Sequence, residues 1–163
     1  MSPRSKKIIV VWDWNGTLVD DAAIFVSIMN SFLQKNSLKK INLKEYKNHF
    51  CFPVENYYKK LGFKLTNKEF QALSSSFIDL YKSKMFLPSL KGGLLPIIKY
   101  LFKRDCVQLV VSAQEKRLLL NSVKYYGLDS FFDGVFGLHN NYAKSKVSIA
   151  KNHVEPMIDS NTK

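Results

Sequence analysis

Apolar residues are arranged along this chain in two patterns, short unbroken runs and longer helical stripes. Ile8–Trp12 is a continuous run rich in β-branched residues, and Val107–Val111 is a second run, interrupted only by Gln108. Phe131–Phe136 is a third, interrupted run. Unbroken apolar runs of this length are typical of strands buried on both faces of a parallel sheet. We therefore predict three parallel strands over these segments.

The other apolar residues recur at helical spacing. This periodicity predicts five helices between the first two runs and two more after the second run. The segments are Ile24–Leu33, Leu43–His49, Val54–Leu61, Phe70–Tyr81, Leu94–Lys103, Glu115–Tyr126 and Ser145–His153. Asp20 and Asp21 are well placed to cap the first helix, and Thr66-Asn67-Lys68-Glu69 has the sequence of a capping box for the fourth.

The order of these segments indicates the fold class. Strands that alternate with helices are typical of an α/β fold with a parallel sheet and right-handed crossovers, a Rossmann-like core. Residues 21–87 contain only helical patterns, so we predict that they form a helical cap. On this interpretation the cap is inserted between two core segments, residues 1–20 and 88–163.

Composition narrows the class of protein. A chain of 163 residues with 46% hydrophobic residues is long enough for one domain with a core. The net charge of +12 is spread over the whole chain, which favours a solvated basic surface and makes a nucleic-acid partner unlikely. No apolar run is long enough to span a membrane, and Cys51 and Cys106 lack metal-ligand spacing. These features predict a cytoplasmic protein with reduced thiols, and no membrane partner.

The candidate chemistry begins where the first apolar run ends. Asp13 directly follows this run, so it is expected at the carboxyl end of the strand, where open α/β sheets bind ligands. Gly16 allows a tight turn in which main-chain amides point at an anion. A plain turn followed by a helix is the alternative interpretation of these residues.

This stretch resembles a known motif. Asp13-Trp14-Asn15-Gly16-Thr17-Leu18-Val19-Asp20 resembles the first motif of the haloacid dehalogenase-like phosphohydrolases, Asp-x-Asp-Gly-Thr-Leu-x-Asp. The resemblance implies that Asp13 is the nucleophile and that Mg²⁺ is bound by its carboxylate and by the backbone carbonyl of Asn15. The family usually has an acid, the general acid and base, where this chain has Asn15. A carboxamide cannot transfer a proton near neutral pH.

The resemblance also implies the phosphate-binding residues. Trp14, Ser112, Ala113 and Lys146 stand at the matching positions, and Lys146 is also expected to steady the charge on the nucleophile. Ser112 has an alternative role, because Ser112-Ala113-Gln114-Glu115 has the sequence of a capping box. Lys144 is the rival of Lys146, and a plain surface lysine is the other possibility.

Several further stretches resemble phosphoglycolate phosphatase-like members. They are Phe52-Pro53-Val54, Leu61-Gly62-Phe63, Val111-Ser112-Ala113, Tyr126-Gly127-Leu128 and Ser145-Lys146-Val147. The implied reaction is magnesium-dependent hydrolysis of a small phosphorylated metabolite, a phosphate monoester, through an aspartyl-phosphate on Asp13.

One part of the family pattern is absent. The segment Glu155–Lys163 contains no Gly-Asp-x-x-x-Asp motif, which supplies the remaining magnesium ligand in the family. We therefore expect a core that is incomplete at its C-terminal end, with Ile8–Trp12 as an exposed edge and with impaired activity. The alternative function is a non-catalytic remnant that binds phosphate or a partner without turnover.

Overall fold

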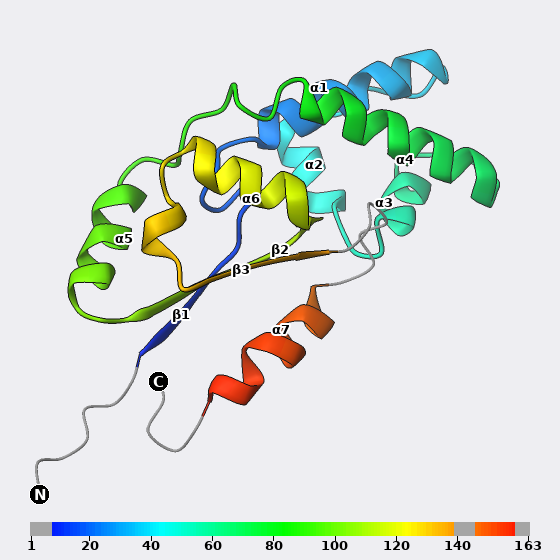
Figure 1. Cartoon of the computed structure of the whole chain (residues 1–163). Helices are drawn as coiled ribbons and strands as arrows, with labels where there is room; N and C mark the ends of the chain where they lie inside the picture. Colours follow the sequence, from blue (N-terminus) through cyan, green and yellow to red (C-terminus); the bar gives the residue numbers. More distant parts are fainter. Residues whose placement is uncertain (1–7, 139–145, 159–163) are drawn as a thin grey trace, which may run out of the picture.

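The chain has an α/β fold built on a three-stranded parallel sheet. A computed structural model describes residues 8–138 and 146–158 (Figure 1). The strands are β1 (Ile9–Trp12), β2 (Val107–Glu115) and β3 (Gly134–Leu138), in the spatial order β1-β2-β3. Ile9 lies opposite Val107, and Val111 lies opposite Phe136. The predicted fold class is confirmed.

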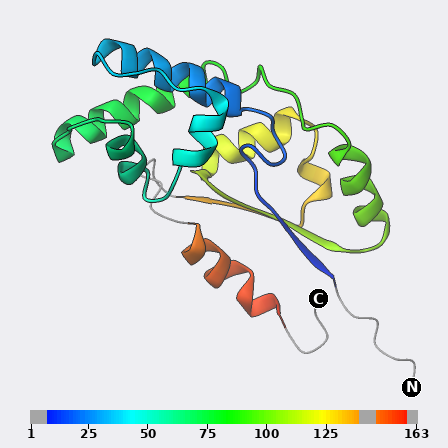
Figure 2. The same ribbon diagram turned by 180° about the vertical axis from the view of Figure 1, so that it is seen from behind.

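Helices cover both faces of the sheet. On one face lie α5 (Leu94–Lys103) and α6 (Lys116–Tyr125), and on the other lies α7 (Val147–His153) (Figures 1 and 2). Val110 packs with the α5 and α6 side chains, whereas Leu109 and Val111 pack with α7. Successive strand residues point to opposite faces, so β2 serves both layers of the core.

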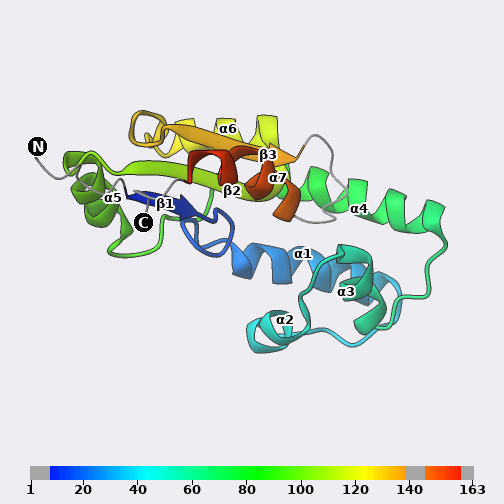
Figure 3. The same ribbon diagram turned by 90° about the horizontal axis from the view of Figure 1, so that it is seen from below.

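The remaining helices form a separate packing unit, here called the helical cluster. It consists of α1 (Ala22–Lys35), α2 (Leu43–His49), α3 (Val54–Lys60) and α4 (Asn67–Lys82), which lie beyond the carboxyl ends of the strands (Figure 3). Their buried side chains make a core of their own, centred on Met29, Leu33, Tyr57, Tyr58 and Tyr81. That these helices act as a cap stays a prediction.

Two predicted boundaries are wrong. The third strand begins at Gly134 because Asp129–Phe131 forms a short 3-10 helix, η1, and the main-chain amide of Asp133 then donates to Gln108 O at 2.8 Å. The predicted capping box at Ser112 is also wrong, because β2 continues to Glu115. The Glu115 carboxylate accepts from the first-turn amides of α6, at 2.9 and 3.1 Å.

The prediction that the first strand is buried on both faces is wrong for the described structure. Val11 is 45% exposed, since β1 has only one strand neighbour, β2, among the described residues. A second 3-10 helix, η2 (Glu155–Met157), follows α7.

Within the described ranges, no helix combines the length and apolarity needed to cross a bilayer. Cys51 and Cys106 are free thiols.

Candidate active site

The site is built around Asp13 at the end of β1. Lys146, at the start of α7, places its Nζ 2.7 Å from Asp13 Oδ1, although the two residues are 133 positions apart. The Thr17 hydroxyl donates to Asp13 Oδ2 at 3.0 Å. Both side chains of the ion pair remain more than a third exposed, so they are accessible to a ligand. Of the two lysines considered for this position, Lys146 is at the site, and Lys144 lies outside the described residues.

A tight turn follows Asp13 and fixes its direction. Gly16 has a φ of +72°, a conformation that strains residues with a Cβ. The amides of Leu18 and Val19 donate to Trp14 O at 2.9 and 3.1 Å, which closes the turn. Trp14 itself points away, because its fully buried indole donates to Ser122 Oγ at 3.2 Å. A phosphate contact from Trp14 is therefore a prediction for its main-chain amide alone.

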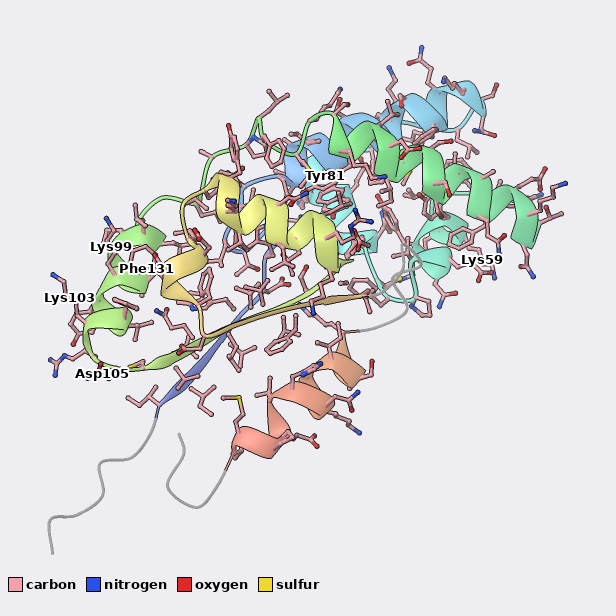
Figure 4. All side chains as sticks on the ribbon, in the orientation of Figure 1. Lys59, Tyr81, Lys99, Lys103, Asp105 and Phe131 are labelled. Atoms are coloured by element: carbon pink, nitrogen blue, oxygen red, sulfur yellow. The ribbon has the colours of Figure 1, made fainter. Side chains whose placement is uncertain are left out.

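Asn15 belongs to a buried hydrogen-bond network. Its Nδ2 donates to Asp21 Oδ2 at 2.6 Å and to the Tyr81 hydroxyl at 2.8 Å. The Tyr81 hydroxyl donates to the same Asp21 oxygen at 2.8 Å, while the Gly16 amide donates to Asp21 Oδ1 at 2.9 Å. Figure 4 labels Tyr81, which comes from α4 and so ties the helical cluster to the Asp13 turn.

This network changes the interpretation of Asp21. Asp21 occupies the N-cap position of α1, but its side chain makes no capping bond to the helix, so the predicted capping role is wrong for it. The carboxylate is fully buried, and this desolvation raises its pKa, partly opposed by the hydrogen bonds from Asn15, Tyr81 and Gly16. Burial and the nearby Asp21 charge likewise raise the pKa of Tyr81.

Ser112 lies on the neighbouring strand, beside Asn15. Its buried hydroxyl donates to Asn15 Oδ1 at 3.4 Å and accepts from the Gln114 amide at 3.1 Å. The parallel pairing of β1 and β2 brings the ends of the two strands together, so the predicted Ser112 and Asp13 motifs meet at one edge of the sheet.

A large cavity opens from this edge toward the helical cluster. Its volume is about 720 Å³, within the range of about 300–1,000 Å³ that is usual for small-molecule sites. Asp13, Asn15, Ser112, Ala113 and Lys146 all line it. The structure thus brings together all the predicted site residues except the Trp14 side chain.

Sequence reasoning missed several polar residues of this cavity, among them Asp21, Tyr81 and Gln114. The sequence predicts a helix cap at Asp21, an apolar helix face at Tyr81 and a capping box that includes Gln114, yet all three line the cavity. No local pattern distinguishes them, because the Asn15–Tyr81 contact joins residues 66 positions apart.

A comparison with protein families decides the relationship. The family model described as haloacid dehalogenase-like hydrolase matches residues 10–154. The chain belongs to this family. A comparison with curated proteins returned no match.

Solved structures of other proteins share the fold. A predicted phosphatase from Clostridium acetobutylicum matches with a TM-score of 0.78 at 15% identity, over 96% of this chain and 74% of that one. A haloacid dehalogenase-like family hydrolase from Streptococcus pneumoniae matches with a TM-score of 0.69 at 18% identity, over 91% and 70%. A predicted phosphoglycolate phosphatase from Haemophilus somnus matches with a TM-score of 0.66 at 17% identity, over 86% and 67%. At these identities the likeness shows the fold alone.

Membership of this family implies a magnesium ion, and the donor set can be tested for one. No three acidic, histidine or cysteine side chains converge in the described ranges. Asp21 is bound within its own network, and Asp20 and Asp13 are paired with Lys91 and Lys146, so Asp13 would hold an ion only by sharing its carboxylate with Lys146. Because Mg²⁺ is often held by one or two carboxylates together with phosphate oxygens and water, these residues fit an ion shared with a bound phosphate.

Proposed function

We propose that this chain is a phosphatase that hydrolyses phosphate monoesters through an aspartyl-phosphate on Asp13. The observation that carries the proposal is the Asp13 carboxylate at the strand end, 2.7 Å from Lys146 and at the mouth of a cavity of ligand size. A carboxylate beside a cation and hydrogen-bond donors suits phosphoryl transfer, which depends on positioning and charge neutralisation.

Each residue has a role in the proposed reaction. Asp13 attacks phosphorus, the bond from phosphorus to the ester oxygen breaks, and water then hydrolyses the acyl phosphate to release inorganic phosphate. Lys146 balances the charge of Asp13 and of the phosphate oxygens, and the Ser112 hydroxyl and the Ala113 amide, from two residues that line the cavity, would hydrogen-bond those oxygens. Asn15 orients by hydrogen bonding but transfers no proton.

Two finer points belong to the same proposal. Asp13 and the main-chain oxygen of Asn15 would hold Mg²⁺, which would neutralise phosphate charge when bound. The sequence resemblance favours phosphoglycolate as the ester, a small phosphorylated metabolite, and this compound is the reference substrate for comparison with other esters.

The test is steady-state hydrolysis of p-nitrophenyl phosphate with Mg²⁺ by the full chain and three variants. We expect Asp13→Asn to abolish turnover, because an amide is not a nucleophile at phosphorus. Lys146→Ala should lower kcat/KM by at least tenfold, since it removes the cation nearest Asp13. Lys103→Ala is the matched control, because Lys103 lies on α5 at the far end of the sheet (Figure 4).

Two results would contradict the proposal. One is retention of most activity by Asp13→Asn. The other is binding of inorganic phosphate without turnover of any ester, which would favour the non-catalytic alternative.

A further inference from the structure

The cavity wall contributed by the helical cluster is aromatic. The rings come from different parts of the helical cluster, so the wall forms only when these helices pack together. The rings used in the argument are those of Phe25, Tyr46, Phe50, Tyr57, Phe77 and Tyr81. Phe25 lies nearly parallel to Tyr81 and to Phe77, with centroids 4.8 and 5.7 Å apart. Such a wall favours a flat, apolar group, which gains from burial and from ring contacts.

The aromatic wall is continuous with the Asp13 site. Tyr81 lies at the end of the wall next to this site, because its hydroxyl is hydrogen-bonded to Asn15 and Asp21. Phe50 stands at the outer end, where it is 38% exposed and its ring centroid lies 5.3 Å from that of Tyr57. A phosphate held at Asp13 would therefore point its ester group along a row of rings.

The charged residues of the lining are mostly paired within the protein, so they attract an anionic ester group only weakly. Three lysines line the cavity, but Lys91 is paired with Asp20 and Lys146 with Asp13, which leaves the exposed Lys47. Of the five acidic lining residues, Asp13 and Asp20 belong to those pairs, Glu55 is paired with Lys59, and Asp21 and Glu115 accept hydrogen bonds within the protein. A carboxylate such as that of phosphoglycolate would therefore meet little attraction here, because an ion pair with an exposed lysine contributes little.

Two residues that line the cavity carry buried polar atoms without a hydrogen-bond partner in the described part of the chain. These atoms are the Tyr57 hydroxyl and both carboxamide atoms of Gln114. Buried polar groups without partners are costly, so a ligand with uncharged donors or acceptors would be stabilised at these positions.

The amide at position 15 also favours an aromatic ester. Without a general acid, an ester oxygen must leave unprotonated, and acid–base help is typically worth about 10²–10⁴-fold. A phenol loses its proton near pH 10, roughly six units more easily than water. An aryl oxygen therefore tolerates the missing acid far better than an alkyl oxygen.

From these observations we propose that the substrate class is phosphate monoesters of phenols bearing uncharged polar substituents. The proposal rests on the phosphatase function proposed above. In the first step a bond forms between Asp13 Oδ and phosphorus, and the bond from phosphorus to the aryl oxygen breaks. The electron pair leaves on the aryloxide, which takes its proton from water. Water then attacks the acyl phosphate, giving inorganic phosphate and the free Asp13 carboxylate.

The test compares phenyl phosphate, benzyl phosphate and phosphoglycolate as substrates of the full chain. We expect kcat/KM for phenyl phosphate to exceed that for phosphoglycolate by at least tenfold. Benzyl phosphate carries the ring on an alkyl oxygen, so it should keep a KM close to that of phenyl phosphate and lose kcat.

Two variants and a control locate the effect. Phe50→Ala should raise KM severalfold for phenyl phosphate and leave phosphoglycolate nearly unchanged, because Phe50 is an outer ring of the wall. Lys47→Ala should affect neither ester. Tyr100→Ala is the matched control, since Tyr100 is an exposed aromatic residue on α5 that does not line the cavity.

A binding measurement separates this inference from the phosphatase proposal. By calorimetry, phenylphosphonate, which cannot be hydrolysed, should bind at least tenfold more tightly than methylphosphonate. If no ester is turned over but this preference is found, the phosphatase proposal fails and the aromatic specificity stands. If phosphoglycolate is turned over as well as phenyl phosphate, or loses activity in Lys47→Ala, the phosphatase proposal stands and the aromatic specificity is overturned.

Discussion

At the scale of single residues, the neighbours of Asn15 explain why an amide suits that position. Its Nδ2 lies 2.6 Å from a carboxylate oxygen of Asp21 and 2.8 Å from the Tyr81 hydroxyl. An acid at position 15 would remove this donor and set two carboxylates against each other, which disfavours ionisation of both. Asn15, the residue that departs from the family motif, is thus the one that donates to the buried Asp21 carboxylate.

We expect Asp21 to make stability depend on pH. Because burial raises its pKa in the folded state, its contribution to the unfolding free energy is fully present below the unfolded value of 3.8. That contribution is lost as pH rises through the higher folded pKa. The unfolding free energy of the natural chain, minus that of Asp21→Asn, should therefore fall as pH rises above 3.8. Urea unfolding at a series of pH values measures this difference.

The control for this measurement is Asp79→Asn, since Asp79 is an exposed residue paired with Lys82. The unfolding free energy of the natural chain, minus that of Asp79→Asn, should not fall with rising pH as it does for Asp21→Asn. A difference for Asp21→Asn that rose with pH would contradict the assigned direction.

The sequence predicts some site residues and not others, for a physical reason. Asp13 and Ser112 each directly follow an apolar strand run, so the pairing of the two strands is enough to bring them together. Lys146 was found by resemblance to the family, because nothing local indicates a contact across 133 positions. Tyr81 and Gln114 come from α4 and from the end of β2, so they meet at the cavity only when the helical cluster lies over the strand ends.

At the scale of secondary structure, local sequence signals predict the helices more accurately than the strands. The capping box at Thr66 is present, with the Glu69 amide donating to Thr66 Oγ1 and the Thr66 amide donating to Glu69 Oε2. The end of β2 and the start of β3 were misplaced. Both depend on long-range pairing, such as that of Glu115 with Leu138, which apolar runs do not reveal.

The cap of α4 should be measurable in stability. Thr66→Ala removes the side chain that accepts from the Glu69 amide, and we expect it to lower the unfolding free energy by about 0.5–2 kcal/mol. Ser75→Ala, an exposed interior position of α4, is the control and should be neutral or slightly stabilising because alanine favours helix. Equal losses in the two variants would show that the capping box contributes nothing measurable.

At the scale of the whole molecule, the candidate function depends on where the helical cluster sits. The sheet ends in the Asp13 site, and the helical cluster lies beyond those strand ends (Figure 3). Residues of both line the cavity. The sequence predicts the helical segment between β1 and α5, but not the cavity that this segment shares with the sheet. The aromatic lining was not predictable, because the same rings also satisfy an ordinary helix core.

The most direct test of the central claim is the site of covalent phosphorylation. The full chain is mixed with p-nitrophenyl phosphate and Mg²⁺, quenched with acid within a turnover, and analysed by peptide mass spectrometry. The account predicts phosphate on the peptide containing Asp13, with none in Asp13→Asn. Phosphate on a different residue, or steady hydrolysis by Asp13→Asn, would contradict it.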